Sequence, residues 1–140
     1  MKVTLERKND NYLFHGIGQT GVPIPIDNTS EPGATGASPM ELLLMGVGAC
    51  SAIDVIFILK KQRQVVTGYT MEVTGERTQI AEAKPFKAAK ITLFLEGDIK
   101  PEKALRAAAL SFEKYCSVSL TLEPCVGVSY QVVLNGTPIQ

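Results

Sequence analysis

The sequence contains no tryptophan, a single histidine and no excess of either charge. Of its 140 residues, 14 are Lys or Arg and 14 are Asp or Glu, so the formal net charge at pH 7 is zero. A neutral chain without a long basic run lacks the electrostatic attraction that drives binding to nucleic acids and anionic membrane surfaces. We therefore expect neither a nucleic acid nor a membrane among its partners.

Cysteine is also scarce, with Cys50, Cys116 and Cys125 and no C-x-x-C or Cys/His cluster. An odd number of cysteines is not typical of a secreted disulfide framework, and the charged segment 1–8 lacks a signal-peptide apolar region. A reducing cytoplasm is expected, where a cysteine pair is more often catalytic or redox-sensing than structural. With His15 as the only histidine, and expected to be an ordinary strand residue, we predict no zinc site.

The longest apolar segment, residues 42–59, approaches the length that spans a bilayer. Asp54 lies within it, at a cost of about 2.5–3.5 kcal/mol in a membrane centre, which favours a buried helix of a soluble protein. Ser38, Pro39 and Glu41 form an N-terminal capping box, so this helix is expected to run from 39 to about 61. Because burial on all sides needs more covering surface than a small domain supplies, we predict a homodimer.

The remaining pattern predicts a single α+β domain over residues 1–140, with element order βββ-α-ββ-α-β. A length of 140 residues suits one domain with a sizeable core. The expected strands lie near 3–5, 12–14, 22–26, 65–78, 91–95 and 126–134, and the second helix near 101–115. A short helical turn is expected over 117–122, and the prolines of 22–26 confine that segment to a sheet edge or to an irregular stretch.

Cys50 stands in the middle of the long apolar helix. A cysteine reacts as its thiolate, and apolar surroundings raise the thiol pKa, so an inert core residue is one interpretation of Cys50. Gly46 and Gly48 favour the other interpretation, because a slim preceding turn leaves room for a substrate or a second sulfur. Asp54 lies one turn later on the same helix face, either as part of the site or as a hydrogen-bonded buried acid at a dimer seam.

Cys116 follows the second helix and opens the expected turn 117–122. A thiol at a helix N-terminus is stabilised as a thiolate, so Cys116 is either reactive or a helix-end contact residue. Cys125 is expected on the last strand, in a structural role.

Two segments carry a family resemblance. Residues 38–50 resemble the helix of the peroxidatic cysteine in the OsmC/Ohr family, and 113–119 resemble that family's second-cysteine segment; the cysteines are 116 − 50 = 66 residues apart. The likeness covers essentially the whole chain and is strongest to the YhfA-like branch. It implies an OsmC-like fold, an intertwined homodimer with central helices at its middle, and reduction of organic hydroperoxides or hydrogen peroxide without a metal, haem, flavin or other cofactor.

The resemblance also implies a role for each thiol. Cys50 becomes the attacking thiolate, which takes the distal peroxide oxygen and forms a sulfenic acid, and Cys116 condenses with it into a disulfide. An external dithiol, such as dihydrolipoamide or a thioredoxin-like protein, would restore both thiols by exchange.

The chain departs from the family pattern at Met40, where better-characterised members carry the glutamate of an Arg–Glu pair that activates the cysteine. Glu41 is adjacent but is assigned to the helix cap, and Arg7 is the only early arginine candidate. Three functions therefore stay open: a two-cysteine thiol peroxidase, a non-catalytic dimer that binds a small hydrophobic or thiol ligand, and a redox-sensing interaction protein.

Overall fold

The computed structural model describes residues 1–140, which form two compact units, 1–43 and 44–140. The first unit holds an antiparallel sheet of β1 (Thr4–Arg7), β2 (Phe14–Ile17) and β3 (Pro23–Ile26), in that order. The proline-containing strand β3 occupies an edge, as predicted, because proline has no N–H to donate to a second neighbour. His15 lies on β2, paired with Pro25.

Helix α1 (Pro39–Lys61) begins at the predicted capping box. The Glu41 N–H donates to Ser38 Oγ at 3.2 Å, while the Glu41 carboxylate accepts from the Ser38 N–H at 2.7 Å and from its hydroxyl at 2.8 Å. These reciprocal bonds satisfy backbone donors that have no partner inside the helix. The hydrogen bond from the Ser38 backbone also lowers the pKa of Glu41, which is solvent-exposed.

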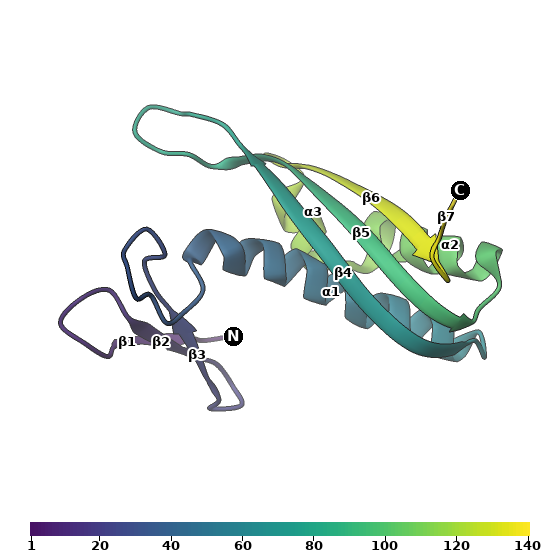
Figure 1. Cartoon of the computed structure of the whole chain (residues 1–140), viewed down its shortest axis with the longest axis horizontal. Coiled ribbons are helices and arrows are strands. Elements are labelled where there is room, and N and C mark those ends of the chain that lie inside the picture. The colour runs from purple at the N-terminus through teal and green to yellow at the C-terminus, as the bar shows by residue number, and fades with distance from the viewer. The chain divides into compact units, whose positions relative to one another are not determined.

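The second unit contains a four-stranded sheet in the order β4 (Val65–Arg77), β5 (Phe86–Asp98), β6 (Gly127–Leu134) and β7 (Thr137–Ile139). Strands β4 and β5 form a long antiparallel hairpin, whereas β5 and β6 are parallel (Figure 1). A parallel neighbour requires a crossover connection. Here the crossover consists of α2 (Pro101–Leu110), the π-helix η1 (Ser111–Tyr115) and α3 (Ser117–Leu122).

The core of this unit lies between one face of the sheet and the helices. In the register of the strands, Ile91 of β5 is opposite Val73 of β4 and Tyr130 of β6, and the same face continues at alternate positions. The buried cluster on this face joins α1, α2, η1 and the sheet, with main members Val55, Leu59, Ile91, Leu93, Leu95, Ala104, Ala108, Phe112 and Val132. The second half of α1 therefore shares one core with the crossover helices and the sheet.

The opposite side of α1 is apolar and exposed. Met45, Ile53 and Phe57 are 55%, 70% and 58% exposed. The single chain therefore buries only one side of α1, and the expected burial nearly all round stays a prediction that belongs to the homodimer. By length and composition α1 could cross a membrane, with 33% of its most apolar window buried. Its inner side packs into the core described above, as the core helix of a soluble protein does.

Three local features differ from the sequence-based expectations. The second helix does not stay α-helical to Tyr115, because its last turn widens into the five-residue η1. A short terminal strand, β7, pairs with β6 and was not predicted. Cys125 lies in an exposed turn before β6, so its predicted position on the last strand is wrong. The turn at 117–122 is the short helix α3, as predicted.

Candidate dithiol site

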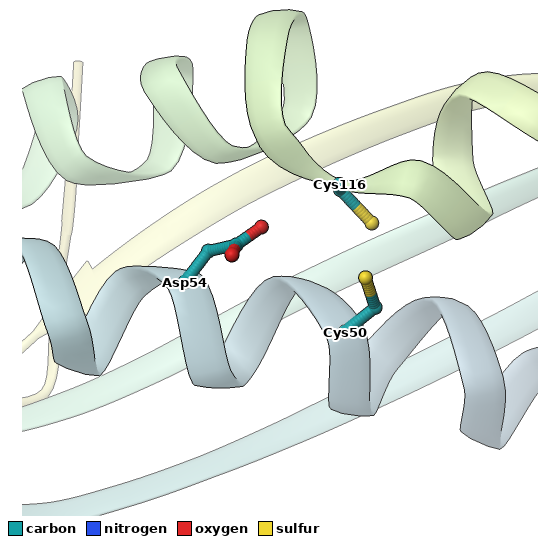
Figure 2. A group of neighbouring side chains, drawn as sticks. All are labelled: Cys50, Asp54 and Cys116. Atoms are coloured by element: carbon teal, nitrogen blue, oxygen red, sulfur yellow. The ribbon is translucent and has the colours of Figure 1, made fainter.

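The fold brings Cys50 and Cys116 together, and Asp54 joins them. The two sulfurs and a carboxylate oxygen of Asp54 all lie within 4.8 Å of one another. Figure 2 shows both thiols pointing toward each other, Cys50 from α1 and Cys116 from the segment between η1 and α3, with the Asp54 carboxylate one helical turn along α1. None of the three cysteines is in a disulfide; Cys50 is half-buried and Cys116 is fully buried.

The π-helix explains how Cys116 reaches this position. Its N–H bonds to the carbonyl of Ser111 at 2.8 Å, five residues earlier, which is the wider spacing of a π turn. Cys116 itself then has extended backbone angles and serves as the N-cap of α3. Its Sγ accepts a hydrogen bond from the Ser119 N–H at 3.4 Å. One residue thus ends the widened turn and starts the next helix, with its thiol directed at α1.

Burial dominates the electrostatics of Cys116. Loss of solvent raises the pKa of its thiol to about 11, the Ser119 N–H lowers it in part, and the neighbouring Cys50 and Asp54 raise it further. The expectation that a helix start would stabilise this residue as a thiolate is therefore only partly met, because one N–H does not offset the lost hydration. At neutral pH Cys116 is a thiol.

Asp54 is held by a hydrogen bond across the helix contact. The Ser111 hydroxyl donates to its Oδ2 at 3.1 Å, and Ser111 itself is fully buried. The bond fixes one carboxylate oxygen of a half-buried acid beside the two sulfurs. Asp54 is therefore a half-buried, hydrogen-bonded acid that lies beside the two sulfurs.

The glycines before Cys50 have different surroundings from those expected. A Cβ placed on Gly48 would lie 2.9 Å from Cγ2 of Val73 on β4, so this glycine allows α1 to approach the sheet. A Cβ on Gly46 would lie 3.8 Å from Val118 of α3, an ordinary van der Waals contact. Gly48 therefore serves helix–sheet packing, and does not make room for a substrate.

The charged residues considered as partners for the thiol have local contacts. The Arg7 guanidinium donates to the backbone carbonyls of Asp10 and Asn11 in its own hairpin. Glu41 is occupied by the helix cap described above. The only carboxylate that the structure places beside the two sulfurs is that of Asp54.

Sequence reasoning missed two serines at this site. Ser111 positions Asp54, and the Ser119 N–H bonds to the Cys116 sulfur, while the buried Ser119 hydroxyl has no hydrogen-bond partner. Ser111 carried a weak signal, because it is a polar residue next to Phe112 on the apolar face of its helix. Ser119 carried none, since its contact depends on the turn at Cys116.

The fold and the paired thiols define an α+β protein with a dithiol centre, and comparison with known proteins gives the family. A model of the OsmC-like proteins matches residues 31–131. Protein YhfA of Escherichia coli K12 is 42% identical over 127 residues, which cover 89% of this chain and 92% of YhfA. The chain therefore belongs to the OsmC-like protein family.

Solved structures agree with this assignment. A hypothetical protein from Aquifex aeolicus is 31% identical with a TM-score of 0.80, over 96% of both chains. An organic hydroperoxide resistance protein from Elizabethkingia anophelis is 14% identical with a TM-score of 0.70, over 96% of this chain and 97% of that one. At that identity the second likeness shows the shared fold.

Proposed function

We propose that this protein is a cysteine-based thiol peroxidase that reduces organic hydroperoxides, with Cys50 as the attacking residue and Cys116 as the resolving residue. The observation that carries the proposal is the placement of two reduced thiols within 4.8 Å, one half-buried and one fully buried. The family supports it, because several structural relatives are named as organic hydroperoxide resistance proteins.

The difference in exposure suggests the order of the two thiols. A peroxide must reach the attacking sulfur, and Cys50 is the thiol that is only half-buried. Its thiolate attacks the distal peroxide oxygen, the O–O bond breaks, and the alkoxide leaves and takes a proton to become the alcohol. Cys50 is then a sulfenic acid.

Cys116 completes the cycle in this scheme. Its thiolate attacks the Cys50 sulfur, the S–S bond forms, and the hydroxide leaves as water. The sulfurs move from a separation of less than 4.8 Å to about 2.05 Å, the length of a disulfide bond. A cytoplasmic dithiol of the dihydrolipoamide or thioredoxin type then exchanges with the disulfide, is itself oxidised, and returns both cysteines to thiols.

The same proposal includes a homodimer. Ala52, Ile53, Ile56, Phe57 and Lys60 line an open and largely apolar groove on the exposed side of α1. A second copy of the chain would cover this surface, and exposed apolar patches on soluble proteins commonly mark such interfaces. Sedimentation should give a dimer for the natural sequence and a monomer for Ile53→Lys. Ile80→Lys, at an exposed apolar residue between β4 and β5, is the matched control; a monomeric natural sequence contradicts this part.

Turnover tests the chemistry. With cumene hydroperoxide and dihydrolipoamide, we expect sustained reduction by the natural sequence and by Cys125→Ser, whose thiol lies in an exposed turn. Cys50→Ser should lose peroxide reduction, and Cys116→Ser should consume one equivalent of peroxide and then stop. Equal rates in all four proteins would refute the peroxidase, and peroxide-independent binding of hydrophobic ligands would then favour the non-catalytic alternative.

A further inference from the structure

We propose that the reduced form of this site binds one zinc ion through Cys50, Cys116 and Asp54. The sequence alone excluded zinc because it contains no C-x-x-C and a single histidine. Such motifs place ligands close together in the sequence, whereas Cys50 and Asp54 lie on α1 and Cys116 lies between η1 and α3. The proposal concerns the dithiol itself and holds whether or not the protein reduces peroxides.

The separations are close to those of a tetrahedral zinc site. With Zn–S bonds of about 2.3 Å, two sulfurs on one ion lie about 3.8 Å apart, and a sulfur and a carboxylate oxygen about 3.5 Å apart. All three donor atoms are already within 4.8 Å of one another. An adjustment of about 1 Å, within the reach of side-chain rotation, would place them around one ion.

The donor set selects the metal. Two thiolates favour a thiophilic ion such as Zn²⁺ over Mg²⁺ or Ca²⁺, which bind oxygen ligands. The carboxylate supplies the third ligand, and water can take the fourth position because Cys50 is half-buried. Each cysteine gives its thiol proton to solvent as it binds.

The surroundings of the donors resemble an outer ligand shell. Metal-bound carboxylates are commonly hydrogen-bonded in turn, and Asp54 already accepts from the buried Ser111 hydroxyl. The Ser119 N–H donates to the Cys116 sulfur, a bond that strengthens when the sulfur carries negative charge. The Asp54 carboxylate and the Cys116 sulfur are therefore each already held by a hydrogen bond.

Zinc binding and disulfide formation exclude each other. A disulfide removes both thiolate ligands, and a bound ion ties up both sulfurs. If the protein is the proposed peroxidase, this mutual exclusion predicts that zinc inhibits peroxide reduction. It also predicts that peroxide oxidation of the zinc-free dithiol prevents zinc binding. The binding site itself is tested without peroxide, so failure of the peroxidase and failure of the zinc site are separate results.

The experiment titrates Zn²⁺ into reduced protein against a competing chromophoric chelator, in a Cys125→Ser background that removes the exposed thiol. We expect one ion per chain. Loss of an outer-shell residue typically lowers metal affinity about 10–100-fold, and loss of a ligand should lower it more. Cys50→Ser and Cys116→Ser should therefore each weaken zinc binding by at least about 100-fold. Asp54→Asn should weaken it by about 10-fold or more.

Cadmium gives a second readout that does not depend on affinity. Thiolate-to-Cd²⁺ charge transfer in the ultraviolet should have the intensity of two sulfurs per ion, and of one sulfur in each single cysteine variant. Far-ultraviolet circular dichroism identifies variants that have failed to fold. If they have, the cadmium spectrum of the folded Cys125→Ser protein alone still tests whether two sulfurs bind the ion. No charge-transfer band in that protein, or equal zinc affinity in the double variant Cys50→Ser/Cys116→Ser, would overturn the proposal.

Discussion

The rate at which Cys116 closes the disulfide should depend steeply on pH. Burial raises the pKa of this thiol to about 11, and the reacting species is its thiolate. Below the pKa, the thiolate fraction changes about tenfold for each pH unit, so it is about 100 times larger at pH 9 than at pH 7. We therefore expect disulfide formation in the zinc-free protein to accelerate about 100-fold between these pH values.

The assay separates this step from the attack on peroxide by sequential mixing. One equivalent of hydroperoxide first converts Cys50 to the sulfenic acid, and a second mix sets the pH. Quenched samples are then analysed for disulfide by mass spectrometry, in a Cys125→Ser background. The Cys116→Ser variant is the control, because its sulfenic acid should persist at every pH.

Asp54 provides a smaller test of the same reasoning. Its charge is one of the causes that raise the pKa of Cys116, and it ranks below burial. Asp54→Asn should therefore accelerate closure at pH 7 without removing the pH dependence. A closure rate that is the same at pH 7 and pH 9 would refute the inference that the buried thiol controls this step.

Three further predictions concern stability, measured by urea unfolding. Gly48→Ala should be about 1–3 kcal/mol less stable than Gly46→Ala. Both variants gain about 1 kcal/mol in helix propensity, but only the Cβ added at Gly48 lies 2.9 Å from Val73 and overpacks the core. Equal stabilities of the two variants would contradict this prediction. Ser38→Ala removes the α1 cap and should cost about 1 kcal/mol, and no loss would mean that the cap is not needed. Burial raises the pKa of Tyr69, so above pH 10 the folded state keeps the phenol proton while the unfolded state loses it. The free energy of unfolding should therefore be constant below pH 10 with respect to this group and fall by up to about 1.4 kcal/mol for each pH unit above pH 10. Tyr69→Phe, which also removes a buried hydroxyl without a partner, should fall less steeply; an identical slope would contradict the assignment.

The sequence was a good guide wherever structure depends on neighbouring residues. The capping box located the start of α1 at Pro39, and alternation of apolar and polar residues located the long strands. The prolines of β3 correctly indicated an edge strand. Each of these signals arises within a few residues of the element it describes.

Features that depend on contacts between distant residues could not be predicted from local sequence patterns. The π turn at Ser111–Tyr115 has no local signal, and it determines where the Cys116 sulfur points. The role of Gly48 depends on Val73, which lies on another element. Residues and spacing suggested two thiols of interest, while the expectation that they meet came from the family resemblance.

The three ligands of the proposed zinc site also depend on distant contacts. Motif reasoning looks for ligands a few residues apart, and Cys50 and Cys116 lie on separate elements. The sequence did place Asp54 one turn after Cys50, but its bond to Ser111 required the tertiary structure. Only the folded chain assembles the three donors.

The most direct test of the dithiol centre is peptide mapping of the natural sequence after one equivalent of cumene hydroperoxide, under non-reducing conditions. We expect a disulfide between Cys50 and Cys116 within one chain, with Cys125 still a free thiol. A protein in which Cys50 and Cys116 stay reduced, or in which oxidation appears first at Cys125, would contradict it.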